Sequence, residues 1–172
     1  MLPVPGCVLQ LPDGVPVAEL SIEGARLIQI TDTVRARFEL AEEGSDKFEG
    51  FRELTYGIAH WAENLSRHLI VLYVHSEFWA GDGIHAVIAW SEGSVMFGPR
   101  FTRTPNEPAE SHYEAADRPA MAINNALRAL GVRAEPPADE FATIGLDRHR
   151  WTAEWPSRRS SHGLEARTQV QR

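Results

Sequence analysis

The chain of 172 residues is 43% hydrophobic and carries a formal net charge of -7. This composition suits one domain with a substantial core and disfavours general binding to nucleic-acid phosphates. Its single cysteine, Cys7, excludes an intramolecular disulfide and a cysteine-based zinc cluster. We find no signal peptide and no apolar run long enough to span a bilayer, so we expect a cytoplasmic protein without a cofactor. We assign residues 1–155 to one domain and the polar residues 156–172 to a disordered tail.

The first third of the chain is predicted to form strands. Apolar and polar residues alternate along 15–22 and along 33–40, and this period of two is typical of half-buried strands. Two further apolar segments, 6–11 and 25–31, are also predicted as strands, and the first of them ends at a Pro-Asp-Gly turn. We therefore expect the domain to begin with a run of short strands.

Two amphipathic helices are predicted further along. The first is capped by Ser45 or Asp46, and its apolar residues recur at three- and four-residue spacing as far as Leu65. The second follows Asp117 as a plausible cap and ends at Gly131, which supplies the left-handed residue of a helix stop. Each helix must bury its apolar stripe against another layer of the protein.

Three more strands are predicted between the helices, at residues 69–78, 84–90 and 95–97. The first is almost continuously apolar, which indicates a central position in the sheet. Gly98 and Pro99 are expected to end the last strand, and residues 102–116 to form a surface loop. We therefore expect an α+β fold with a mainly antiparallel sheet of about five to seven strands and both helices packed on one face.

Polar residues near the turn between the first two of these strands form the candidate metal or catalytic site. His75 and Glu77 are two residues apart on a strand and therefore point to the same face. His85 lies on the next strand, and Asp82 lies in the turn. Two histidines and two carboxylates are ligands that a divalent metal accepts, and they also suit an acid–base enzyme. We favour the simpler interpretation, in which His75 and Glu77 form an ordinary polar pair and no metal is bound.

Aromatic and acidic residues form the candidate partner surface. The segment 147–155 combines charged residues with two tryptophans, which either clamp a partner or pack on the core, and we favour packing. Exposed tryptophans are typical interface anchors, and an acidic loop suits a basic partner. The residues that we expect to contact a protein partner are Glu42, Glu43, Asp46, Trp79, Asp82 and Trp151.

Parts of the chain resemble a group of small bacterial proteins, namely residues 73–90, 122–131 and 145–155. In general character, this group is similar to the cytoplasmic immunity proteins of polymorphic-toxin systems. The likeness covers roughly residues 50–155 and implies a binding role, without any catalytic residue. The expected function is therefore a non-enzymatic protein-binding module, in particular an immunity protein that neutralises a basic toxin domain. A small metal-dependent or acid–base enzyme is the alternative, and a homodimeric structural subunit is the third hypothesis.

Overall fold

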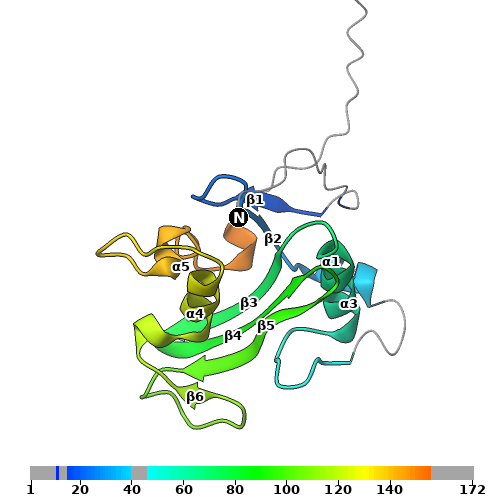
Figure 1. The fold of residues 1–172 in the computed structure, drawn as a ribbon. Coiled ribbons are helices and arrows are strands. Elements are labelled where there is room, and N and C mark those ends of the chain that lie inside the picture. Colours follow the sequence, from blue (N-terminus) through cyan, green and yellow to red (C-terminus); the bar gives the residue numbers. More distant parts are fainter. Residues whose placement is uncertain (1–10, 12–14, 40–45, 156–172) are drawn as a thin grey trace, which may run out of the picture.

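The computed structural model describes residue 11, residues 15–39 and residues 46–155. The main sheet has the order β3-β4-β5-β6, in which the first three strands are antiparallel and β6 runs parallel to β5 (Figure 1). Its strands are β3 (Val71–Trp79), β4 (Asp82–Ser91), β5 (Ser94–Arg103) and β6 (Glu114–Ala115). A separate two-stranded sheet consists of β1 (Val17–Glu19) and β2 (Arg26–Ile28). The α+β class and the mainly antiparallel sheet are therefore confirmed.

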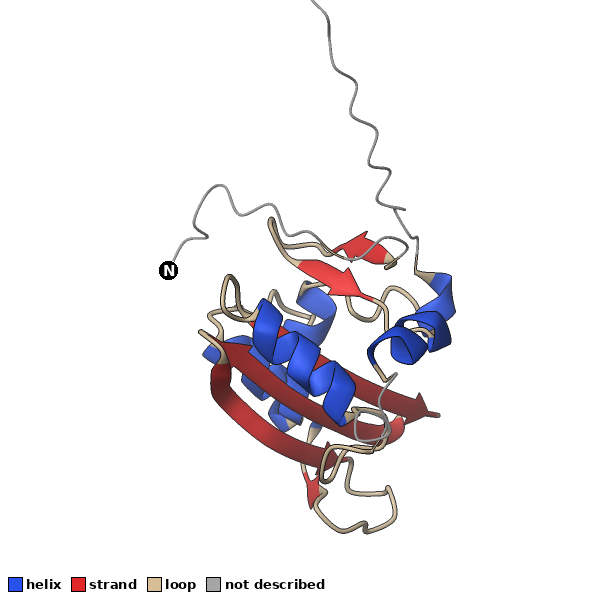
Figure 2. Cartoon of the chain, turned by 90° about the vertical axis from the view of Figure 1, so that its right-hand side faces the viewer, coloured by secondary structure: helices blue, strands red, loops and turns tan. Residues whose placement is uncertain are grey.

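The two amphipathic helices pack on opposite faces of the sheet, so the prediction of a single covered face is wrong. Helix α3 (Tyr56–Leu65) packs with Ile84, Ala86, Ile88 and Trp90 of β4. Helix α4 (Ala122–Ala129) packs with Val87, which points the other way. Figure 2 shows helices both in front of the sheet and behind it. The reason is visible in β4, where consecutive residues are buried because both faces of this strand are covered.

Strand β3 lies at an edge of the sheet, so the prediction that residues 69–78 form a central strand is wrong. Among the strands that the structure describes, β3 pairs with β4 alone, from Val71 opposite Trp90 to Trp79 opposite Asp82. Val71 packs with the cluster around α3, and the adjacent Leu72 packs with the cluster around α4. A continuous run of apolar residues therefore indicates a strand that is covered on both faces, and it does not distinguish a central strand from an edge strand.

The predicted strand at 33–40 is a helix, α1 (Asp32–Phe38), over its described residues. Thr31 caps it, with Thr31 Oγ1 accepting a hydrogen bond from the Val34 amide at 3.4 Å. Val34 is buried, and Phe38 stacks on Trp61 of α3 with ring centroids 4.1 Å apart. The alternation misled because residues four apart, such as Val34 and Phe38, also share one face of a helix.

Three element boundaries also differ from the prediction. Helix α3 begins after Thr55 and not at Asp46, because the intervening chain turns at Gly50, where φ is 80°. Strand β5 continues through Gly98 and Pro99 to Arg103, because these two residues form a bulge opposite β4 between Val87 and Ala89. The predicted loop at 102–116 contains the short strand β6.

The second predicted helix is divided between a 3-10 turn, η1 (Arg118–Ala120), and α4. Gly131 follows with a φ of 92°, as expected for a helix stop. The last elements are α5 (Glu140–Thr143) and a second 3-10 turn, η2 (Thr152–Glu154). No helix within the described ranges is both long enough and apolar enough to cross a membrane. Cys7, Glu42, Glu43, the tail 156–172 and residues 6–10 of the predicted first strand lie outside the described residues.

Candidate functional site

The polar pair predicted on β3 is present. His75 Nε2 lies 2.7 Å from Glu77 Oε1, and the other carboxylate oxygen of Glu77 accepts a hydrogen bond from Arg52 at 2.8 Å. Arg52 also pairs with Glu110, whose hydrogen bond is the main cause that raises the pKa of the guanidinium above its ordinary value. Both oxygens of Glu77 are thus engaged, and the arrangement ties the loop that carries Glu110 to the sheet.

The structure does not bring the four candidate metal or catalytic residues together. His85 lies opposite Ser76 in the strand register, so it points to the α4 side, whereas His75 and Glu77 point to the α3 side. Asp82 accepts a hydrogen bond from Thr104 Oγ1 at 2.9 Å and holds the turn against β5. Within 15–39 and 46–155, no three His, Cys, Asp or Glu residues are grouped so that they could hold a metal ion.

His85 instead belongs to a separate polar and aromatic site. The residue is 4% exposed, and its ring lies between Phe78, in an edge contact at 5.2 Å, and Phe141, which stacks on it at 5.4 Å. Its buried Nδ1 has no hydrogen-bond partner within residues 15–39 and 46–155. Burial lowers the pKa of the imidazole from 6.5 to about 4, so the ring is neutral at pH 7.

A hollow of about 550 Å³ opens beside His85, between the sheet and the segment that carries α4 and α5. We call it the α4–α5 hollow. Its volume falls in the range of about 300–1,000 Å³ that is typical of ligand sites. The lining residues that matter below are Phe78, His85, Arg118, Met121, Asp139, Phe141, Asp147 and Arg150.

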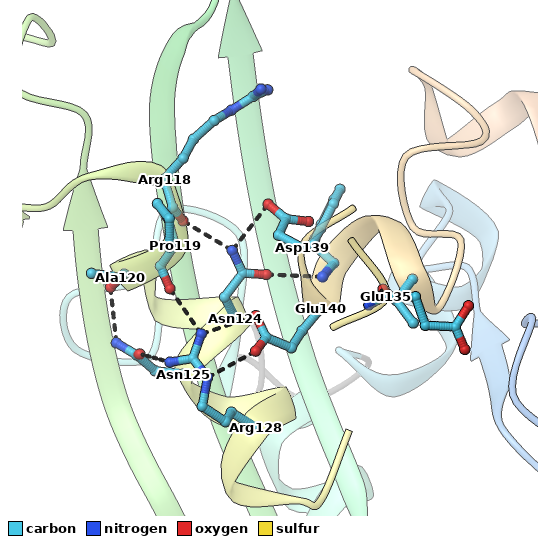
Figure 3. A network of polar contacts seen from close by, with 11 residues as sticks. Arg118, Pro119, Ala120, Asn124, Asn125, Arg128, Glu135, Asp139 and Glu140 are labelled. Carbon is cyan, nitrogen blue, oxygen red and sulfur yellow. Dashed lines mark hydrogen bonds and ion pairs between the residues drawn. The ribbon is translucent and has the colours of Figure 1, made fainter. Parts of the chain in front are cut away.

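Asn124 of α4 makes polar contacts to the segments that form the wall of this hollow (Figure 3). The residue is 1% exposed. Its Nδ2 donates to the Arg118 carbonyl at 2.9 Å and to Asp139 Oδ2 at 3.2 Å. Its Oδ1 accepts from the Phe141 amide at 2.8 Å. One side chain thus joins η1, α4 and α5, and it positions the segments that carry Arg118 and Phe141.

An ion pair between α4 and α5 supports the same wall (Figure 3). Arg128 donates from Nε to Glu140 Oε1 at 2.8 Å and from Nη2 to Glu140 Oε2 at 2.9 Å, which is a bidentate geometry. The Arg128 hydrogen bond is the main cause that lowers the pKa of Glu140 below its ordinary value. Arg128 also donates to the Pro119 carbonyl at 3.0 Å, so the pair links α5 to the turn that carries Arg118.

Two tryptophans from distant parts of the chain meet at the rim of the hollow. The guanidinium carbon of Arg150 lies 5.1 Å from the ring centroid of Trp79 and 5.2 Å from that of Trp151. Trp79 is 75% exposed and Trp151 is 59% exposed. We call these three residues the Trp–Arg–Trp surface. Trp155, by contrast, is buried and packs against His149 at 4.9 Å.

The remaining candidate partner residues lie elsewhere. Asp46 precedes α3 in a loop whose Phe48 packs against the cluster on the α3 side of the sheet. Arg118 and Phe141 were not singled out from the sequence, because neither belongs to a recognisable motif. Their role follows from folding the segment 118–141 over the α4 side of β3 and β4. Searches of protein-family models, curated proteins and solved structures found no match to this chain.

Proposed function

We propose that this chain is a non-enzymatic protein-binding module whose partner docks on the Trp–Arg–Trp surface. The observation that carries the proposal is the exposure of two tryptophan rings on one arginine. Tryptophan and arginine are the residue types that most often dominate binding energy at protein interfaces. Large exposed aromatic surface is also costly in water unless a partner covers it.

The position of Arg150 over the two rings supports this proposal because it preorganises the surface for binding. A guanidinium over two aromatic faces restricts the rotamers of all three side chains. Side chains that are already ordered lose less conformational entropy on association. We therefore expect the two rings to act as rigid anchors.

The net charge supports a basic partner. A formal charge of -7 attracts positively charged proteins at long range and accelerates their association. An immunity protein that neutralises a basic toxin domain in the cytoplasm is the specific form of this proposal. The enzyme alternative is less well supported, since His85 points to the opposite face from His75 and Glu77.

The test is capture of the partner by purified tagged protein from a lysate of the organism that encodes it. Wild type is compared with the double variant Trp79→Ala/Trp151→Ala. The matched control, Val95→Ala/Met96→Ala, also removes two exposed apolar side chains, but it does so at the other end of the sheet. Circular dichroism verifies that all three proteins are folded.

We expect wild type and control to retain one protein in equimolar amount, and the tryptophan variant to retain at least about tenfold less of it. The complex is expected to weaken as salt concentration rises, because salt screens long-range attraction. Equal retention by all three proteins, or no stoichiometric partner for wild type, would count against the proposal.

A further inference from the structure

We propose that the α4–α5 hollow is a binding site for a small aromatic carboxylate, with Arg118 as the group that binds its charge. This proposal does not depend on the protein partner proposed above. It rests on three observations within the part of the chain that the structure describes: an aromatic floor, an arginine without a carboxylate partner, and a buried histidine with an unpaired nitrogen.

The floor of the hollow suits a planar apolar group. Phe78, His85 and Phe141 contribute three rings, and Met121 beside them is fully buried. The ring of His85 is neutral and lies within stacking or edge distance of both phenylalanines. A further aromatic ring packs favourably on such a surface in an offset or edge-on arrangement.

Arg118 supplies the charge that a carboxylate needs. Its guanidinium carbon lies 5.8 Å from the centroid of the Phe78 ring, and it forms no ion pair with any carboxylate of the described ranges. No hydrogen bond within the described ranges uses the side-chain N–H groups of Arg118, so these donors are available. Two of these donors match the two oxygens of a carboxylate, which gives a bidentate contact.

Two aspartates also line the hollow, and they differ in how their charges are neutralised. Asp139 accepts hydrogen bonds from the Ala142 amide at 2.9 Å and from Asn124 at 3.2 Å, so its carboxylate is already stabilised by the protein. Asp147 accepts no hydrogen bond from any part of the chain that the structure describes. Its negative charge opposes that of a bound anion, and we expect it to weaken binding.

The test uses three probes that share one ring and differ in charge: benzoate, benzyl alcohol and benzylamine. Binding to the full chain is measured by calorimetry, and the location is read from the NMR shifts of the His85 ring. Arg118→Gln removes the proposed charge partner. Arg100→Gln is the matched control, because Arg100 also lies over a phenylalanine ring, 6.0 Å from the centroid of Phe97, but lies outside the hollow.

We expect benzoate to bind at least about tenfold more tightly than the two other probes and to shift the His85 resonances. Arg118→Gln should lose at least about tenfold in benzoate affinity, Arg100→Gln should bind like wild type, and Asp147→Asn should bind more tightly. Equal affinity for benzoate and benzyl alcohol, unchanged binding by Arg118→Gln, or no binding of benzoate would overturn the proposal.

A free acid and the C-terminus of a protein share this chemistry, and one more probe separates them. The dipeptide acetyl-Gly-Phe carries the same ring and carboxylate at a chain end. Tighter binding of the dipeptide than of benzoate assigns the site to a protein terminus, and weaker binding assigns it to a free acid. Arg118 lies outside the Trp–Arg–Trp surface, so Arg118→Gln should still capture the partner in the lysate experiment.

Discussion

Replacing Asn124 by alanine should destabilise the protein far more than the same change at its neighbour Asn125. Asn124 is buried and makes three hydrogen bonds, to the Arg118 carbonyl, to Asp139 and from the Phe141 amide. At about 1 kcal/mol of net stability for each bond, the loss is about 3 kcal/mol. The newly unpaired Phe141 amide adds to this cost, because a donor shielded from water has lost its acceptor.

Asn125 is the matched control because it follows Asn124 directly in α4 and its side chain also makes hydrogen bonds. Its Nδ2 donates to the Ala120 carbonyl at 2.8 Å and its Oδ1 accepts from Arg128 at 3.1 Å, but both bonds lie at the surface, where water replaces them. We expect Asn125→Ala to cost less than about 1 kcal/mol. Both changes give the helix an alanine, so the gain in helix propensity cancels in the comparison.

The assay is urea unfolding at pH 7, followed by tryptophan fluorescence. The midpoint of Asn124→Ala should fall clearly below that of Asn125→Ala, while the slope of the free energy against urea stays constant. If the two variants differ by less than about 1 kcal/mol, the network around Asn124 does not hold the wall of the hollow as argued.

Three further predictions concern charge and packing. Because the pKa of Glu140 is lowered in the folded chain, its ion pair with Arg128 stabilises the fold above about pH 4.5, and this stabilisation is lost as pH falls further. Glu140→Gln should therefore be less stable than wild type at pH 7, and the two proteins should become similar in stability in acid. Between pH 6.5 and about 4, His85 takes up a proton in the unfolded chain but not in the folded chain. The free energy of unfolding of wild type should therefore fall by up to about 3 kcal/mol across this window relative to that of His85→Phe. Parallel curves of stability against pH for the two proteins would refute this. A methyl group at Gly83 overlaps the Glu77 carbonyl of the paired strand, so Gly83→Ala should lower the melting temperature by several degrees, and an unchanged melting temperature would contradict this reading.

Local signals in the sequence were sufficient to predict those elements whose apolar period, or whose turn and stop residues, fit only one kind of structure. The apolar stripe that ends near Leu65 predicts α3, and Gly131 correctly marks the end of the second helix. The turn between residues 91 and 94 predicts the hairpin of β4 and β5. Alternation alone was ambiguous at 33–40, because Val34 and Phe38 satisfy a helical spacing as well as a strand spacing.

The sequence by itself determined the α+β class and the antiparallel hairpins, because these depend on residues close together in the chain. Only the tertiary structure decided which face of the sheet each helix covers, since an amphipathic stripe specifies that a surface is buried and not against what. The strand register decided that His85 points away from His75 and Glu77. The later segment folds back over the sheet, and this brings Trp79 and Trp151 together across Arg150. The same folding places Arg118 over Phe78. Nothing local in either segment of the sequence encodes these contacts.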